Sequence, residues 1–551
     1  MPRAQRLSLA GFGLAAVTSA ALLLWAGQDY FFFSDELTWF AEAPPDYDPG
    51  VLLRPSNTHL IAVPRIVHAT LLHAFGPDYL PWRVTGVLGV IVCAGLFFLL
   101  ARRRIGELAL LPTIVLLFLG SSWDTVVSPV GLPFLLATGA GLGSLLALER
   151  SDRRGDVAAC VLATVAVASH SFGLIFLVGV AVSILVGRDR VRRAWVFATP
   201  LALYVLWWSL AARPPGAGGS LAQASNLLLL PPYAVVALGA AVAAVTGLNE
   251  LDFATVAGFN RLPERSWILT PPLGLAAGVL VLLRLRRGNL RPAMWAFLAT
   301  LVAFLVSIGV SVGPGRPPTA ARYLFPGAVI VLLVAAEAAR GVRSSRRVVG
   351  VLVAVTAFSL AVNLFHLLEA RTFLNAYAIN AGPTLTMVEL ARAEVDSGFR
   401  PGRQARGASA GEVGVPAGAY LRGIANWGSV APTLEEVRRR PRAVRDRADV
   451  VLARAKGLRL VPATSGRRRD RCTGGAGRPV RLDLRPGERT VLENLGGGSA
   501  IVALRRFGPS FAASVGGVAP GETALVGAEG DAAPEPWEIR VSGAAVRACR
   551  L

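Results

Sequence analysis

The sequence contains few charged residues for its length. Only 17% of the 551 residues are Asp, Glu, Lys or Arg, whereas soluble domains carry about 25%. Hydrophobic residues make up 53% of the chain, which excludes intrinsic disorder because disordered chains are poor in apolar residues. The apolar residues occur in long blocks separated by arginine clusters, and this pattern indicates a polytopic membrane protein rather than several soluble domains.

Common nucleotide-binding and dithiol motifs are also missing. The sequence has no P-loop, no GxGxxG after a strand pattern and no CxxC pair. ATP-driven transport and Rossmann-type chemistry therefore lack support. Of the four cysteines, Cys93 and Cys160 lie in apolar spans. Cys472 and Cys549 lie in the polar C-terminal part, and we expect them to pair if that part faces an oxidising compartment.

Lysine is nearly absent, since Lys456 is the only one, and arginine supplies the net charge of +21. Much of this charge lies in short clusters between apolar spans, such as Arg102–Arg104 and Arg284–Arg291. There it sets membrane orientation, so we expect no nucleic acid partner. With every cluster on the cytoplasmic side, the chain makes about 11 crossings, with its N-terminus inside and its C-terminus outside. Residues 226–248 are also apolar enough to cross, but a full crossing would place the Arg284–Arg291 cluster outside. We therefore expect this segment to enter and return or to lie at the interface.

The fold class predicted is mainly α, a polytopic transmembrane helical bundle with a small external C-terminal α/β or β-sandwich domain. Residues 1–369 form the bundle, and its first external loop covers residues 28–81. Residues 370–551 form the external domain. We expect this domain to be helical over residues 371–460, and to be rich in β-strands over residues 472–551, where short alternating runs are separated by turn signals.

The first external loop carries two adjacent carboxylates, Asp35 and Glu36, directly after the aromatic run Phe31–Phe33. Partial desolvation at the water–lipid boundary raises the pKa of a carboxylate. A raised pKa suits a general base that activates a hydroxyl near neutral pH. The alternative is an ordinary polar loop beside an interfacial aromatic belt.

Positive groups gather on the same predicted face. His59, Arg65 and Arg83 follow the carboxylates, and Arg322 begins a late span. Arginine binds phosphate through two parallel hydrogen bonds, and the positive-inside rule disfavours an outer arginine such as Arg322 without a function. The histidines lack a zinc spacing, so we expect no metal site. Trp123, Asp124 and His170 lie on this face too, although each alone is better explained by an ordinary structural role.

This layout resembles the GT-C superfamily of multispanning glycosyltransferases, which take sugar from a polyprenyl-phosphate or polyprenyl-diphosphate donor. The resemblance covers about residues 8–369. It is carried, in this order, by the first helix followed by Asp35-Glu36, by Asn57-Thr58-His59, by Phe75-Gly76 and Trp82-Arg83 at the entry to the second span, and by Arg322-Tyr323.

The resemblance implies a membrane glycosyltransferase with Asp35 or Glu36 as catalytic base, the other carboxylate orienting the acceptor. Arg322, His59, Arg65 and Arg83 would bind the donor phosphate. The partners implied are a polyprenyl-phosphate-sugar donor, an envelope glycan, lipid or protein acceptor, and the bilayer. Direct displacement would invert the anomeric centre. No cofactor is certain, and assistance by a divalent cation is left open.

Three alternatives stay open at this point. A transporter or flippase for a lipid-linked sugar usually shows internal repeats and charges at mid-span, but the spans here are nearly free of charge apart from Glu107 and Glu337. A lipid-linked glycan ligase usually has its large loop late in the bundle, whereas here the first loop is the large one. A non-catalytic envelope scaffold would bind through its C-terminal domain.

Overall fold

The fold is described from a computed structural model, and the chain divides into two compact units. The first comprises Met1–Trp39 with Ala43–Leu374, and the second Phe40–Glu42 with Asn375–Leu551. The division after Leu374 lies five residues beyond the expected boundary at residue 369. The structure describes residues 3–33, 35–187, 189–211, 224–249, 266–288, 290–313, 316–342, 345–402, 413–463, 470–475, 479–485 and 487–551.

The first unit is built of apolar helices. Seven helices within the described ranges are long and apolar enough to cross a membrane, because about 20 apolar residues span the hydrocarbon core. They are Gln5–Ala26, Leu80–Leu117, Pro129–Leu148, Ile268–Arg286, Pro292–Val310, Ala321–Ala338 and Arg346–Leu390. Three shorter apolar helices accompany them, Gly173–Leu185, Trp195–Leu210 and Leu230–Thr246. The chain is thus a multi-pass membrane protein with a mainly helical fold.

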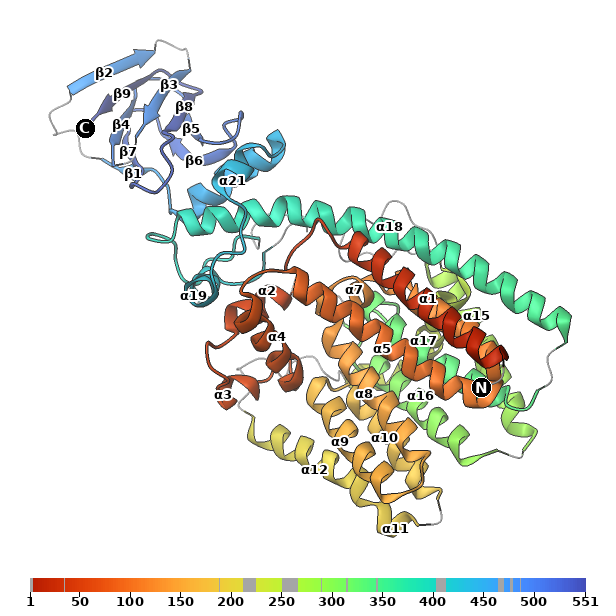
Figure 1. The fold of residues 1–551 in the computed structure, drawn as a ribbon. Coiled ribbons are helices and arrows are strands. Elements are labelled where there is room, and N and C mark those ends of the chain that lie inside the picture. Colours follow the sequence, from red (N-terminus) through yellow and green to blue (C-terminus); the bar gives the residue numbers. More distant parts are fainter. Residues whose placement is uncertain are drawn as a thin grey trace. The chain divides into compact units, whose positions relative to one another are not determined.

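The helices are labelled in chain order in Figure 1. The first part of the chain contains α1 (Arg3–Ala26), α2 (Asp35–Glu42), α3 (Pro49–Leu52), α4 (Ala62–Phe75), α5 (Leu80–Ile105), η1 (Gly106–Ala109), α6 (Leu110–Leu117), η2 (Gly120–Ser122), α7 (Trp123–Val126), η3 (Pro129–Gly131) and α8 (Leu132–Leu148). There follow α9 (Arg153–Ser169), α10 (Gly173–Leu185), α11 (Arg190–Arg193), α12 (Trp195–Leu210), α13 (Ala224–Leu228), α14 (Leu230–Thr246), α15 (Ser266–Arg286), α16 (Pro292–Val310), α17 (Ala321–Ala338) and α18 (Arg346–Leu390).

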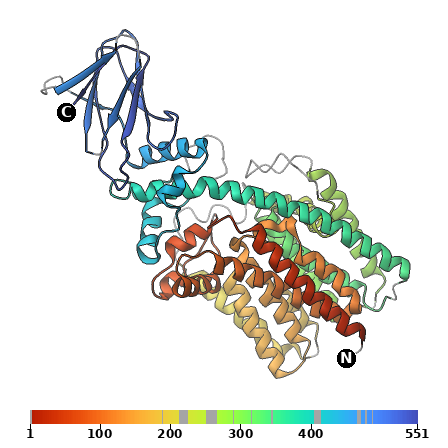
Figure 2. The same ribbon diagram turned by 45° about the horizontal axis from the view of Figure 1, so that its top comes forward.

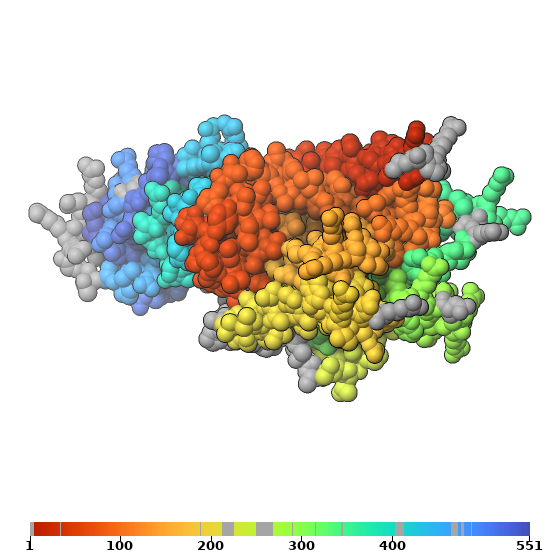
Figure 3. All heavy atoms as spheres, turned by 60° about the horizontal axis from the view of Figure 1, so that its bottom comes forward, coloured from red at the N-terminus to blue at the C-terminus, as the bar shows by residue number. Residues whose placement is uncertain are grey.

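The predicted first loop, residues 28–81, folds into three short helices, α2, α3 and α4. They lie together at the end of the bundle where α5 begins (Figure 1). Helices α9, α10 and α12 pack against one another, and their orange and yellow residues form part of the face shown in Figure 3. The loop helices therefore cover one end of the bundle, beside the turns that join its later helices.

Helix α14 corresponds to the segment that the sequence analysis singled out for its parity, and both of its ends lie near this same end of the bundle. Before it, the Asn226 side chain donates hydrogen bonds to the carbonyl oxygens of Val310 and Val312, at 3.1 and 2.8 Å. Near its other end, the carbonyl of Ala244 accepts from Asn363 at 3.0 Å. Asn363 in turn accepts from the backbone N–H of Ser121, which precedes α7.

The opposite end of the bundle carries a buried charge network. Arg104, at the end of α5, donates to Glu337 of α17 through Nε and to Glu149 after α8 through Nη2, both at 2.7 Å. The side chains of Arg104 and Glu337 are 1% and 3% exposed, and the guanidinium also lies 4.8 Å from the ring centre of Phe297. A charge buried this deeply is tolerated only when it is paired. The network therefore ties three helices together.

The second unit combines the last part of α18 and three further helices with a β-sandwich. The helices are α19 (Ala417–Trp427), α20 (Leu434–Arg438) and α21 (Arg442–Ala455). The strands are β1 (Val461–Pro462), β2 (Asp470–Gly475), β3 (Val480–Leu484), β4 (Arg489–Asn494), β5 (Ala500–Arg505), β6 (Ala513–Val518), β7 (Thr523–Gly527), β8 (Trp537–Ser542) and β9 (Val546–Arg550). Part of the stretch expected to be helical, residues 403–412, lies outside the described residues.

Two antiparallel sheets make up the sandwich (Figure 2). Their strand orders are β1-β7-β4-β9-β2 and β3-β8-β5-β6. Alternate residues of β8, Trp537, Ile539 and Val541, are buried, as a strand with one covered face requires. They join Leu492 of β4 and Ala548 of β9, from the other sheet, in one hydrophobic core.

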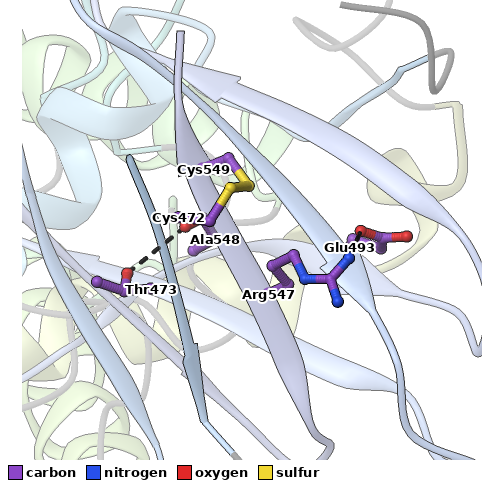
Figure 4. The surroundings of a disulfide bond; sticks show 6 residues. All are labelled: Cys472, Thr473, Glu493, Arg547, Ala548 and Cys549. Carbon is purple, nitrogen blue, oxygen red and sulfur yellow. Dashed lines mark hydrogen bonds and ion pairs between the residues drawn. A yellow bond between two sulfur atoms is a disulfide. The ribbon is translucent and has the colours of Figure 1, made fainter. Parts of the chain in front are cut away.

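A disulfide joins Cys472 of β2 to Cys549 of β9, residues that face each other across neighbouring strands. Figure 4 shows its surroundings, where Thr473 donates to the carbonyl of Ala548 at 3.5 Å and Arg547 pairs with Glu493 at 3.3 Å. The bond closes a loop of 77 residues and so links the start of the sandwich to its end.

Candidate functional site

A small pocket opens in the first unit between the loop helices and the turns of the bundle. Its walls come from segments far apart in the sequence, and several carry polar or charged side chains. The lining residues are Asp35, Trp39, Ser56, Asn57, His59, Ile61, Asp124, Val130, Gly131, Pro133, Phe134, His170 and Arg322. Three of the predicted site residues, Asp35, His59 and Arg322, thus lie on one pocket.

Asp35 is the first residue of α2 and faces the pocket. Its Oδ2 accepts a hydrogen bond from the side-chain amide of Asn57 at 3.3 Å. Burial raises the pKa of Asp35, while Arg322 and Arg316 oppose this shift. A carboxylate that is desolvated but keeps cationic neighbours is suited to accept a proton from a bound hydroxyl.

A tight turn brings Asn57 and His59 to the pocket. The backbone N–H groups of Ser56 and His59 each donate to the carbonyl of the other residue, at 2.9 and 2.8 Å. Asn57 and Thr58 between them have φ values of +46° and +72°. Positive φ at both central positions is typical of the tightest hairpin turns, but it is strained for a β-branched residue such as Thr58. Such strain is often stored at functional sites.

Arg322 reaches the pocket from the start of α17. Ser122 fixes this helix start, because its hydroxyl donates to the carbonyl of Ala321 at 2.7 Å and accepts from the N–H of Phe325 at 3.1 Å. Thr125 donates to the carbonyl of Arg322 itself at 3.4 Å. The arginine is therefore held in place by the segment that also carries Asp124.

Two histidines line the pocket side by side. The rings of His59 and His170 are 4.2 Å apart, and Phe134 lies 4.4 Å from His170. Burial, with a smaller effect of Arg316, lowers the pKa of His59 to about 4, and burial lowers that of His170 as well. Both rings are therefore neutral at pH 7. They offer hydrogen bonds and apolar surface, and His59 is not a permanent cation for a phosphate.

His170 also has a defined tautomer when neutral. Its Nδ1 accepts from the backbone N–H of Phe172 at 3.1 Å, so Nε2 carries the proton. His59 contacts the hydroxyl of Ser171 through Nδ1 at 2.5 Å. The short turn between α9 and α10 thus orients both imidazoles.

Asp124 is a second pocket carboxylate that sequence reasoning assigned to an ordinary structural role. It is buried, and burial raises its pKa to about 6, with Arg322 opposing the shift. Its Oδ1 has no hydrogen-bond partner within the described part of the chain. The signal in the sequence was its position on the same predicted face as Asp35. The spacing of the motifs does not indicate that Asp124, His170 and Arg322 converge.

Glu36 lies next to Asp35 in sequence but is absent from the pocket lining. It is completely buried. Its carboxylate accepts from the hydroxyls of Tyr79 and Ser128 at 2.5 and 2.7 Å, and from the N–H groups of Phe33 and Val130 at 3.1 and 2.5 Å. The structure therefore separates the two carboxylates that the sequence offered as alternatives.

Arg65 and Arg83, two of the predicted phosphate ligands, do not line the pocket either. Arg65 of α4 donates to the carbonyl of Val51 at 3.0 Å and to that of Arg54, so it closes the end of α3. Arg83 of α5 donates to the carbonyl of Leu24 near the end of α1. Cations commonly satisfy the free carbonyls of a helix end in this way.

No group of three or more His, Cys, Asp or Glu side chains that could hold a metal ion occurs among the described residues. The pocket does contain the carboxylates of Asp35 and Asp124, which are oxygen ligands of the kind that Mg²⁺ and Ca²⁺ prefer. Two carboxylates alone do not complete such a site, which would also need oxygen ligands from water and substrate.

No known family model matches the sequence, and no curated protein matches it. Among solved structures, the chain is similar to ArnT from Cupriavidus metallidurans bound to undecaprenyl phosphate, with 15% identity and a TM-score of 0.45 over 74% of this chain and 84% of that one. The apo state of ArnT gives 14% identity and 0.46 over 77% and 90%. Arabinosyltransferase EmbB from Mycobacterium smegmatis gives 12% and 0.32 over 100% and 64%.

Proposed function

We propose that this chain is a membrane glycosyltransferase that transfers a sugar from a polyprenyl-phosphate donor to an envelope acceptor at the outer face of the membrane. The observation that carries the proposal is that Asp35 and Arg322 line one pocket. The pocket thus offers a desolvated carboxylate for the acceptor and a guanidinium for a phosphate. The reaction needs a base for the acceptor hydroxyl and a positive charge for the leaving phosphate, and these two groups supply them.

In the proposed reaction, the acceptor hydroxyl attacks the anomeric carbon of the donor sugar. A new C–O bond forms there as the bond from that carbon to the phosphate oxygen breaks. The hydroxyl proton passes to Asp35, and the electron pair of the broken bond leaves with the polyprenyl phosphate. Attack from the face opposite the phosphate would invert the anomeric centre.

The leaving phosphate gains negative charge, and positive groups that are already in place stabilise it most effectively. Arg322 is held for this role by Ser122 and Thr125. Arg316 is close enough to influence Asp35 and His59 electrostatically, so we assign it a supporting role. His59 would donate a hydrogen bond rather than a charge.

The outer-face assignment rests on the arginine clusters of the sequence and fits the contacts of the bundle. Arg104 lies at the end opposite the pocket, and the positive-inside rule assigns its cluster to the cytoplasm. Both ends of α14 contact segments at the pocket end. Because α14 is one continuous helix, these contacts support the alternative that residues 226–248 lie at the interface without crossing, and with it about 11 crossings, a cytoplasmic N-terminus and an external second unit.

The test compares cells that express the wild type, no protein, Asp35→Asn or Asp46→Asn. Lipid-linked sugars and envelope sugar composition are measured in each strain. We expect Asp35→Asn to match the deletion, with one polyprenyl-phosphate sugar accumulating and one envelope sugar lost, because removal of a general base costs about 10²- to 10⁴-fold in rate. Asp46 is an exposed carboxylate in the same loop, so Asp46→Asn should match the wild type.

The proposal fails if the deletion changes the envelope while the Asp35→Asn protein, present in the membrane at normal level, restores it fully. In that case Asp35 is not the base, and a transport or scaffold role becomes the better hypothesis. The sugar that is lost in the deletion would identify the donor.

A further inference from the structure

The carboxylate of Glu36 collects hydrogen bonds from three separate segments. Oε1 accepts from the Ser128 hydroxyl and the Val130 N–H, and Oε2 accepts from the Phe33 N–H and the Tyr79 hydroxyl. A carboxylate has about four acceptor positions, so these donors fill them all. Because Glu36 is also completely buried, a substrate in the pocket has no route to it.

The segments that Glu36 holds include part of the pocket wall. Val130 and Gly131 line the same pocket as Asp35, and η3, which contains them, begins directly after Ser128. The backbone at Gly131 packs closely against Thr125, because a Cβ on Gly131 would lie 2.4 Å from the Cα of Thr125. This part of the wall therefore has little room to shift. On the other side, the Phe33 N–H bond fixes the chain just before Asp35.

From these contacts we infer that Glu36 is a positioning residue, which holds the Val130–Gly131 wall and the start of α2 in register so that Asp35 faces the bound acceptor. The expected effect of Glu36 on the transfer rate rests on the proposed function. Its expected effect on the position of the pocket wall does not. It also removes Glu36 as an alternative base, because all of its acceptor positions are occupied.

The present pattern of four donated hydrogen bonds requires the ionised carboxylate. A protonated Glu36 would itself donate from one oxygen, so the Tyr79 or Ser128 hydroxyl would have to turn from donor to acceptor, and the protonated oxygen would hold its backbone N–H partner more weakly. Burial raises the pKa of Glu36 to about 7, against the lowering effect of its hydrogen bonds. The titratable groups that face it are Tyr30 and Tyr79, whose own pKa values are raised by burial so that both remain protonated. Arg83 is close enough to influence both phenols electrostatically. Glu36 is therefore half ionised at about pH 7; the four bonds are fully present well above that pH and weaken as the pH falls through it.

The first experiment measures hydrogen–deuterium exchange of the full-length protein in detergent, and it needs no activity. The variants are Glu36→Gln, which cannot accept all four bonds, Ser128→Ala, which removes one donor, and the exposed control Asp46→Asn. We expect faster exchange in peptides that contain the Phe33 and Val130 amides for Glu36→Gln, a smaller effect at Val130 for Ser128→Ala, and no change for Asp46→Asn. Unchanged exchange in Glu36→Gln would overturn the inference.

The second experiment measures the pH profile of transfer. Removing the Ser128 hydroxyl takes away a bond that favours ionised Glu36, so its pKa rises. The acid limb of kcat should then move to higher pH in Ser128→Ala, with the plateau at high pH nearly unchanged. For Glu36→Gln we expect a loss of about 100-fold in kcat at all pH values, the size of effect that a misplaced group produces. An acid limb that does not move in Ser128→Ala would contradict the inference.

The two proposals fail separately. If Asp35→Asn remains active while Glu36→Gln accelerates exchange at Val130, the assignment of the base is wrong and the positioning role stands. If Asp35→Asn is inactive and Glu36→Gln changes neither exchange nor rate, the base stands and the positioning role is wrong. Should Glu36→Gln fail to fold, Ser128→Ala still decides the question through the pH profile, because it removes the hydroxyl that donates to Glu36 and otherwise only a longer contact of 3.3 Å from the Val130 N–H.

Discussion

Asp35 and Glu36 are neighbours in sequence with opposite surroundings. Both lie in the first turn of α2, where successive side chains point about 100° apart around the helix axis. Asp35 therefore faces the pocket while Glu36 points into the protein. The sequence singled out the pair but could not choose between its members, because the choice depends on which face of α2 packs against Tyr79 and Ser128.

Arg322 provides a prediction at the scale of a single residue. Replacement by Gln removes the guanidinium but keeps a polar, uncharged side chain, so binding of polyprenyl phosphate should weaken by about 10- to 100-fold, as expected for hydrogen bonds to a charged group. Arg322→Lys should recover only part of this, since an ammonium cannot form the bidentate contact. The measurement is titration of the purified protein with undecaprenyl phosphate. Arg54→Gln, at an exposed loop arginine, is the matched control, and equal affinity in Arg322→Gln would rule out the assigned role.

At the scale of an element, the turn at residues 56–59 stores strain at Thr58. A left-handed conformation costs a non-glycine residue about 1–2 kcal/mol, and glycine costs roughly 0.5–1 kcal/mol through the unfolded chain. Thr58→Gly should therefore raise the free energy of unfolding by up to about 1 kcal/mol. Chemical denaturation in detergent would measure this. Thr70→Gly, inside α4, should instead lower stability, and a destabilised Thr58→Gly variant would show that the threonine makes a compensating contact.

The crossing of α14 and α15 depends on close backbone approach. A Cβ added to Gly239 would lie 1.7 Å from the carbonyl oxygen of Thr270, so Gly239→Ala must push the two helices apart. Gly278 of α15 has open space around it, and Gly278→Ala should be harmless. We expect Gly239→Ala to lower the melting temperature of the detergent-solubilised protein by several degrees relative to Gly278→Ala. Equal melting temperatures would mean that the helices can separate at no cost.

Many elements followed from the sequence because their signals are local. Long apolar runs predicted the spanning helices, and short alternating runs such as Trp537–Val541 predicted strands. The turn at Asn57 and Thr58 could not be predicted, since neither Asn-Thr nor its neighbours form one of the usual hairpin sequences. Its conformation is imposed by the contacts around the pocket.

At the scale of the whole molecule, the second unit is closed by the disulfide between Cys472 and Cys549. A bond that closes 77 residues is worth roughly 4 kcal/mol in the chain-entropy model. The double variant Cys472→Ser/Cys549→Ser should therefore lower the unfolding free energy of the second unit by about this amount and leave the first unit unchanged. Limited proteolysis under increasing denaturant, followed on fragments of each unit, would measure it.

The control for this prediction is Cys160→Ala, which changes a free cysteine of the first unit. Loss of stability in the first unit after removal of the disulfide would contradict the expectation that the two units unfold independently.

The pairing itself was predictable from the positions of the two cysteines in the polar part of the chain. The convergence of Asp124, His170 and Arg322 was not, because it depends on how helices far apart in sequence pack together.

The buried pair of Arg104 and Glu337 has a consequence for how the protein is made. The two residues are 233 positions apart, so at about 5–20 residues per second a ribosome delivers Glu337 roughly 10–50 s after Arg104. Glu149 arrives after only 45 residues. A nascent chain therefore holds Arg104 with one acidic partner while the 233 − 45 = 188 residues up to Glu337 are made, and the arrival of α17 completes the network at the end of the bundle opposite the pocket.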